Sequence, residues 1–201
     1  MIQEEKKMFP YVIINNENCQ NRDILIKAAE EVTFPLTKED REITEQLIYQ
    51  FRHEENCAGL AAPQIGFSKR IIIFSVPEET KEHRVDAFDT ISETLLINPT
   101  FKPLSDKKRL DWEACFSVND YGGEVERFIH VYYEGFDING KEIKGEAKGF
   151  LARLIQHEIG HLNGQLFIHL LKPNARQGTL EEIRAVRRSE LEAMKKASAQ
   201  E

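Results

Sequence analysis

The sequence has few of the features that define nucleic-acid-binding, membrane and secreted proteins. Basic residues are not in excess, because 27 Lys and Arg stand against 34 Asp and Glu, for a formal net charge of -7. We therefore expect no nucleic-acid groove. No apolar run approaches the roughly 18 residues of a membrane-spanning helix, and residues 1–8 lack the basic-then-apolar order of a secretory signal. These absences predict a soluble, cytoplasmic protein that does not contact a membrane.

Cysteine is also scarce, with three residues at wide and irregular spacing, Cys19, Cys57 and Cys115. An odd number at such spacing argues against a disulfide scaffold and leaves buried, reactive or metal-binding thiols. The chain contains no low-complexity segment, internal repeat or Pro/Gly/Ser-rich linker. At roughly 100–200 residues per domain, we expect a single domain over residues 1–201.

Three segments have the apolar spacing of helices. Thr37, followed by acidic residues, begins an amphipathic helix of about four turns. Residues 150–164 form a second helix with a strong apolar face. Thr179 and Glu182 make a capping box for a last helix over about residues 179–198.

Strands are predicted between the first two helices. Residues 70–76, 94–98 and 125–134 are rich in β-branched, apolar or aromatic side chains, and Pro99 is expected to stop the second of these strands. Asn139 and Gly140 predict a tight hairpin turn, and therefore an antiparallel sheet. The order helix, strands, helix, helix indicates an α+β fold.

Residues 157–161, HEIGH, form an H-E-x-x-H motif inside the second predicted helix. Two histidines four positions apart lie on one helix face, so His157 and His161 can bind one metal ion, and Glu158 between them can reach a water molecule on that ion. The alternative is a solvated helix with two surface histidines.

A catalytic metal needs another protein ligand besides two histidines. Cys115 is the strongest candidate, because a thiolate binds Zn²⁺ or Fe²⁺ well and its neighbours do not follow a simple strand pattern. The alternative is an inert buried cysteine, which remains our interpretation of Cys19 and Cys57.

Three segments together resemble the peptide deformylase family. Residues 57–64, CAGLAAPQ, approach its motif G-x-G-x-A-A-x-Q; residues 113–117, EACFS, approach E-G-C-x-S; and residues 156–161, QHEIGH, approach Q-H-E-x-D-H. Three motifs in order are a specific signal. The resemblance implies antiparallel sheets around a central metal-binding helix, followed by a C-terminal helix.

The resemblance also implies the reaction, which is removal of the N-formyl group from the initiator N-formylmethionine of new polypeptides, with release of formate. One divalent metal ion is expected on Cys115, His157 and His161, with Fe²⁺ favoured in the cell and Zn²⁺ or another transition metal as the alternative. Glu158 would act as base and then as acid.

Other site residues are carried over from the family motifs. The Gln64 side chain and the backbone N–H of Phe116 would meet the charge that develops on the formyl oxygen. Four residues are expected to border the substrate: Gly59, Ala58, Glu113 and Phe150. Arg127, which matches an arginine common in the family, is expected to brace Glu113.

The expected partners are N-formylmethionyl nascent peptides. The last helix belongs to a segment with more basic than acidic residues, which leaves two interpretations. It is either a solvated helix or a surface that contacts the ribosome transiently.

Three motif positions depart from the family, with Cys57 and Ala114 where it has glycine and Gly160 where it has aspartate. Ala114 would shift the backbone if the family glycine has a positive φ, Gly160 removes a carboxylate that could orient a ligand, and Cys57 could crowd the metal. Restoring the family residues, through Ala114→Gly and Gly160→Asp, is therefore expected to raise turnover.

The departures leave two alternatives to an active but divergent deformylase. One is a weak or silent relative that binds formylated peptides or a partner. The other is a general H-E-x-x-H protease, which is disfavoured by the glutamine and cysteine motifs and by the lack of a later third ligand.

Overall fold

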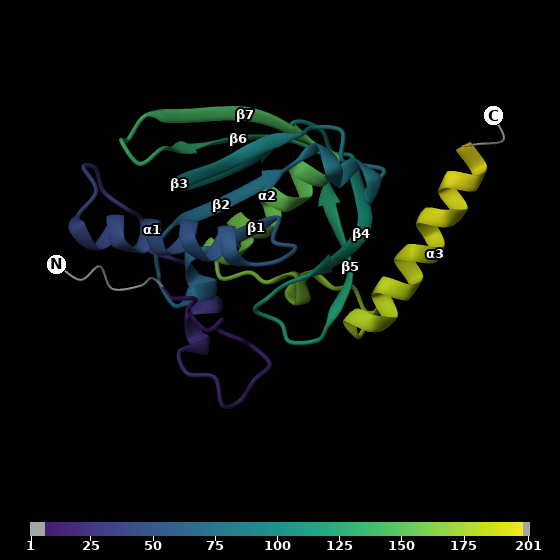
Figure 1. Ribbon diagram of the computed structural model, residues 1–201, viewed down its shortest axis with the longest axis horizontal. Helices are drawn as coiled ribbons and strands as arrows, with labels where there is room; N and C mark the ends of the chain where they lie inside the picture. Colours follow the sequence, from purple (N-terminus) through teal and green to yellow (C-terminus); the bar gives the residue numbers. More distant parts are fainter. Residues whose placement is uncertain (1–6, 199–201) are drawn as a thin grey trace.

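The computed structural model describes residues 7–198, with side chains placed through residue 193. Residues 1–6, where we predicted no secretory signal, and residues 199–201 of the predicted domain lie outside the described residues. Two antiparallel sheets surround α2 (Gly149–Leu162), which confirms the predicted α+β class (Figure 1). Short 3-10 helices occur at Arg22–Leu25, Ala62–Ile65, Glu78–Glu82 and Phe167–Leu170.

The larger sheet has the strand order β1-β2-β3-β6-β7. Its strands are β1 (Gly59–Ala61), β2 (Ile71–Val76), β3 (Ile91–Pro103), β6 (His130–Phe136) and β7 (Glu142–Lys148). The predicted hairpin turn at Asn139 and Gly140 joins β6 to β7, and Gly140 has a φ of 78°, which glycine adopts without strain.

Helices cover both faces of the larger sheet at β2. Ile72 and Phe74 belong to the apolar cluster formed with α2, whereas Ile71 and Ile73 belong to the cluster formed with α1 (Lys38–His53). Burial on both faces explains why β2 is a continuous apolar run rather than an alternating one. Thr37 caps α1, as predicted.

The smaller sheet contains β4 (Lys108–Ala114), β5 (Gly122–Phe128) and β8 (Gln177–Gly178). The last helix, α3 (Leu180–Ser198), begins at the predicted capping box of Thr179 and Glu182. It packs through the buried Ile183 beside β5, and its second half projects away from the body of the molecule (Figure 1). None of the helices within residues 7–198 is long and apolar enough to cross a membrane.

Two strand predictions were wrong in their limits. Pro99 does not end its strand, because the pairing of β3 with β6 shifts register between Ile97 and Thr100, and this irregularity accommodates a residue without an N–H. The segment 125–134 is not one strand. It is divided at Ile129 between β5 and β6, which belong to different sheets.

Candidate metal centre and active site

The H-E-x-x-H motif on α2 faces the residues that follow β4. His157 and His161 lie near the end of α2, and Cys115 is the first residue after β4. Cys115 Sγ lies 3.3 Å from His161 Nε2. One possible ligand atom from each of the three residues lies within 4.8 Å of the other two. The tertiary structure therefore brings the three predicted ligands to one point.

The donor set fits a divalent transition metal. A thiolate with two imidazoles suits Zn²⁺ or Fe²⁺, whereas Mg²⁺ and Ca²⁺ require oxygen ligands. Burial holds the pKa of His161 well below its ordinary value, so its imidazole is neutral, which is the form that coordinates a metal.

Glu113 contacts the imidazole of His157. Its Oε2 lies 2.9 Å from His157 Nδ1, which leaves Nε2 as the ring nitrogen available to a metal. Arg127 donates two hydrogen bonds to the carboxylate, at 2.9 and 2.8 Å, and Arg153 Nη1 donates a third at 2.7 Å. Burial raises the pKa of Glu113, but the bonds from Arg127 and His157 outweigh it and hold this pKa well below its usual range.

Glu158 is buried against the first motif. Its Oε2 has no hydrogen-bond partner among the described residues, and burial raises its pKa to about 7. A Cβ built on Gly59 would lie 2.5 Å from Glu158 Oε1. Gly59 therefore leaves room for the Glu158 carboxylate, a role that we did not predict when we expected Gly59 to border the substrate.

Gln64 lies beside the sulfur of Cys115. Its Nε2 is 3.3 Å from Cys115 Sγ, and its Oε1 accepts a hydrogen bond of 2.8 Å from the Ala61 backbone N–H, so the amide group is oriented. The Phe116 ring stacks on Tyr11, with 4.9 Å between ring centroids, which anchors the chain directly after Cys115.

A cavity of about 580 Å³ opens onto these groups. All four residues predicted to border the substrate line it: Ala58, Gly59, Glu113 and Phe150. Trp112 and Leu154 add apolar surface, and Arg184 and Arg187 of α3 lie on its wall.

The departures from the family motifs do not disturb the group of three possible metal ligands. Ala114 is not among the described residues with positive φ, so it causes no strain. Cys57 lines the adjoining cavity rather than the one that contains the ligands, and its thiol donates to the Gly59 carbonyl at 3.3 Å. It therefore does not crowd the metal position.

Gly160 is explained by close packing. A Cβ at this position would lie 2.7 Å from the backbone oxygen of Gln165. Replacing Gly160 with aspartate would therefore displace this turn, which corrects the expectation that the change would simply restore an orienting carboxylate.

Comparison with known proteins decides the family. Residues 16–177 match the polypeptide deformylase family. The chain belongs to the peptide deformylase family. It is 48% identical over 168 residues to peptide deformylase 2 of Rickettsia conorii, a match covering 81% of this chain and 83% of that protein.

Solved peptide deformylases have the same fold. The enzyme from Ehrlichia chaffeensis superposes with a TM-score of 0.69 at 28% identity, covering 96% of this chain and 97% of that one. A Met-Ala-Ser-bound enzyme from Acinetobacter baumannii superposes with a TM-score of 0.69 at 27% identity, covering 83% and 100%. Peptide deformylases are metal-dependent enzymes that remove the N-formyl group from nascent polypeptides, and this chain is such an enzyme.

Sequence reasoning missed Arg153. Besides Glu113, this buried arginine binds the backbone oxygens of Arg109 and Val125, at 2.7 and 2.8 Å, and so connects α2 to the smaller sheet. The available signal was an arginine within a predicted helix whose face was otherwise apolar.

Proposed function

We propose that Cys115, His157 and His161 hold one divalent metal ion, Fe²⁺ in the cell, at which this enzyme removes the formyl group from N-formylmethionyl peptides. The convergence of these three ligand atoms beside the buried carboxylate of Glu158 carries the proposal. Bound there, the metal would polarise the formyl oxygen and acidify a water molecule.

The protein side chains then perform the proton transfers. Glu158 accepts the proton of the attacking water and donates one to the amine nitrogen as the C–N bond breaks. The Gln64 amide and the Phe116 backbone N–H donate hydrogen bonds to the formyl oxygen, where negative charge develops. Glu113 positions His157, while Gly59, Ala58 and Phe150 border the substrate.

A formate-release assay tests the proposal. Protein purified without oxygen and analysed for metal should release one formate for each formyl-Met peptide consumed, and removal of the metal by a chelator should abolish this activity. Restoring Fe²⁺ or Zn²⁺, but not Mg²⁺, should recover it. Peptide binding without formate release by the metal-loaded protein would instead favour the silent alternative, and internal cleavage would identify a protease.

Replacing Glu113 with glutamine should destabilise the protein and weaken metal binding. The change leaves the guanidinium groups of Arg127 and Arg153 buried without their counter-charge, which costs about 3–5 kcal/mol, and it should lower metal affinity by about 10–100-fold. Denaturant unfolding and metal titration measure the two effects. Glu93→Gln is the matched control, because it breaks a more exposed pair with Arg52, worth about 1 kcal/mol or less. Equal losses of stability and metal affinity in Glu113→Gln and Glu93→Gln would contradict the role assigned to Glu113.

Replacing Gly59 with alanine should displace the Glu158 carboxylate and lower turnover by about 100-fold, since a misplacement of about 1 Å can have that effect. Metal content should not change. If the alanine lowers turnover by displacing Glu158, adding Gly59→Ala to Glu158→Gln should lower turnover little further. Additive losses in kcat would show that Gly59 acts independently of Glu158.

We place the reaction in the cytoplasm, where formylated chains are made. A transient ribosome contact through α3 stays a prediction, which co-sedimentation of the protein with ribosomes would check.

A further inference from the structure

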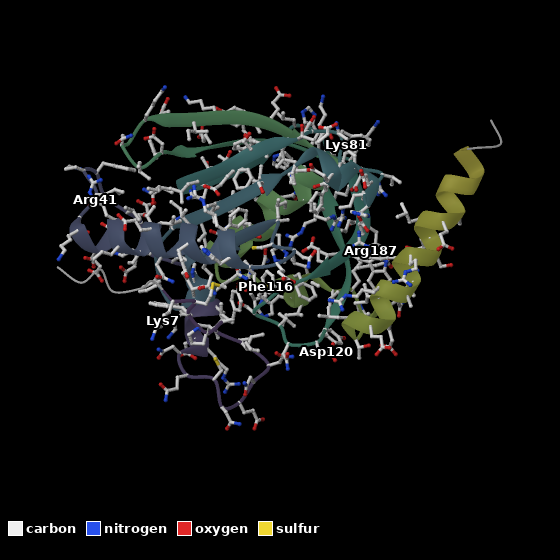
Figure 2. All side chains as sticks on the ribbon, viewed as in Figure 1. Lys7, Arg41, Lys81, Phe116, Asp120 and Arg187 are labelled. Atoms are coloured by element: carbon white, nitrogen blue, oxygen red, sulfur yellow. The ribbon has the colours of Figure 1, made fainter. Side chains whose placement is uncertain are left out.

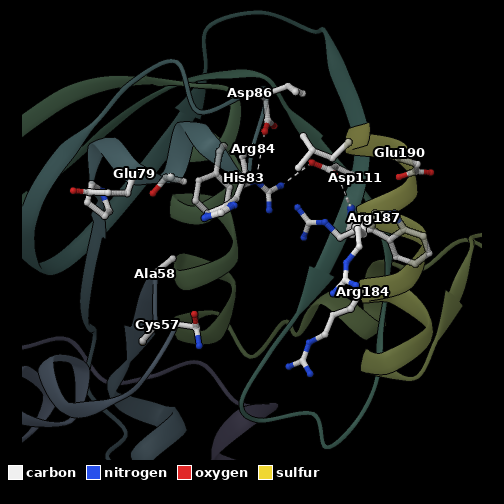
Figure 3. Close-up of a pocket in the computed structure, with 18 of the residues that line it drawn as sticks. Cys57, Ala58, Glu79, His83, Arg84, Asp86, Asp111, Arg184, Arg187 and Glu190 are labelled. Carbon is white, nitrogen blue, oxygen red and sulfur yellow. Dashed lines mark hydrogen bonds and ion pairs between the residues drawn. The ribbon is translucent and has the colours of Figure 1, made fainter. Parts of the chain in front are cut away.

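Three arginines of α3, Arg184, Arg187 and Arg188, lie beside the candidate active site. Arg184 and Arg187 line both the cavity that contains the metal ligands and an adjoining cavity of about 1110 Å³, and Arg188 lines the latter. In Figure 3, Arg184 and Arg187 extend from α3 into the space across from Cys57 and Ala58. None of the three makes a hydrogen bond or ion pair with another residue in the part of the chain that the structure describes. We refer to them as the α3 arginines.

Three carboxylates whose charges act on Arg187 already have other partners. Arg84 pairs with Asp111 at 2.7 Å and with Asp86 at 3.4 Å, and Glu190 pairs with Arg176 at 2.7 Å. Because each of these carboxylates is paired with another arginine, together they offset the charge of Arg187 only in part. This wall of the cavity therefore favours an anion.

Arg187 has the strongest requirement for a partner. It is half-buried, and burial, followed by the neighbouring Arg84, lowers its pKa more than the nearby carboxylates raise it. A guanidinium in such a place gains from a carboxylate, which it can bind through two parallel hydrogen bonds.

We propose that the α3 arginines bind acidic side chains of the nascent peptide downstream of its formylmethionine, so that this deformylase prefers acidic N-terminal sequences. The inference rests on the active-site assignment above. A peptide with its formyl group beside Cys115 and Glu158 occupies the cavity whose wall carries Arg184 and Arg187. Aspartate or glutamate a few residues after the methionine supplies the complementary charge.

Paired substrates test the proposal. We would measure kcat/KM for formyl-Met-Ala-Ala-Ala and for versions with aspartate at the second, third or fourth position. In the metal-loaded enzyme at low salt, aspartate at one or more of these positions should raise kcat/KM by about 3–10-fold. The gain should come from a lower KM, because the arginines bind a side chain that takes no part in the reaction, and it should become smaller as salt is added.

The variant Arg184→Gln/Arg187→Gln should bring the ratio of kcat/KM for acidic and neutral peptides to about one. Arg187→Lys should retain part of the preference, and Arg187→Glu should favour a lysine-containing peptide. Arg41→Gln is the matched control, because Arg41 is an exposed arginine on α1, far from Arg187 (Figure 2). This control should leave the ratio unchanged. Arg187→Glu, which reverses the charge, still tests the proposal if the double variant Arg184→Gln/Arg187→Gln folds poorly.

The outcomes separate this inference from the active-site assignment. If the metal-loaded wild type releases no formate from the neutral peptide, the active-site assignment itself is overturned. Turnover of the neutral peptide with equal ratios in wild type and variants overturns only the role of the α3 arginines. Loss of ribosome binding in the double variant without a change in the ratio also overturns it, and assigns these arginines to RNA.

Discussion

Replacing Glu158 with glutamine should lower turnover by about 10²–10⁴-fold while the metal content stays the same. Glutamine keeps the size of the side chain but cannot accept the proton of the attacking water. The free energy of unfolding should not fall, because the buried Oε2 has no hydrogen-bond partner to lose among the described residues and a neutral amide avoids the burial of a charge. Single-turnover formate release, elemental analysis and denaturant unfolding measure the three quantities.

Glu55 supplies the matched control for this experiment. It is an exposed acidic residue that lines the same cavity, so Glu55→Gln makes the same substitution and leaves the buried carboxylate in place. We expect its turnover to stay within about twofold of the wild type. Near-wild-type turnover in metal-loaded Glu158→Gln would contradict the proposed proton transfers. Another group would then have to act as the general base.

The second large effect concerns the metal itself. The double variant Cys115→Ala/His157→Ala should lose stoichiometric metal and, with it, formate release, because one remaining imidazole cannot hold a divalent ion at a catalytic site. Elemental analysis of protein purified without oxygen gives the stoichiometry, and it also identifies the native metal in the wild type.

Cys57→Ala and His53→Ala serve as controls for the loss of a thiol and of an imidazole. Neither residue belongs to the group of possible ligands, and His53 is exposed at the end of α1. Both variants should retain one metal ion per chain. Stoichiometric metal in the Cys115→Ala/His157→Ala double variant would refute the ligand assignment.

Short-range patterns predicted much of the fold. The caps of α1 and α3, the hairpin between β6 and β7 and the apolar face of α2 all depend on residues close in sequence. The predicted limits were wrong at Pro99 and Ile129 because both depend on pairing with other strands. A register shift accommodates the first, and the second lies where the chain passes from the smaller sheet to the larger one.

The sequence by itself determined the family and the candidate metal ligands, because the identity of a ligand and the four-residue spacing of two histidines on a helix are local properties. Only the tertiary structure decided what surrounds them. The ion pairs of Glu113 with Arg127 and Arg153, the space that Gly59 leaves for Glu158 and the position of Arg187 at the cavity join segments distant in sequence. Such contacts follow from how α2 packs between the two sheets and how α3 lies beside β5, and no periodicity within a single segment encodes them.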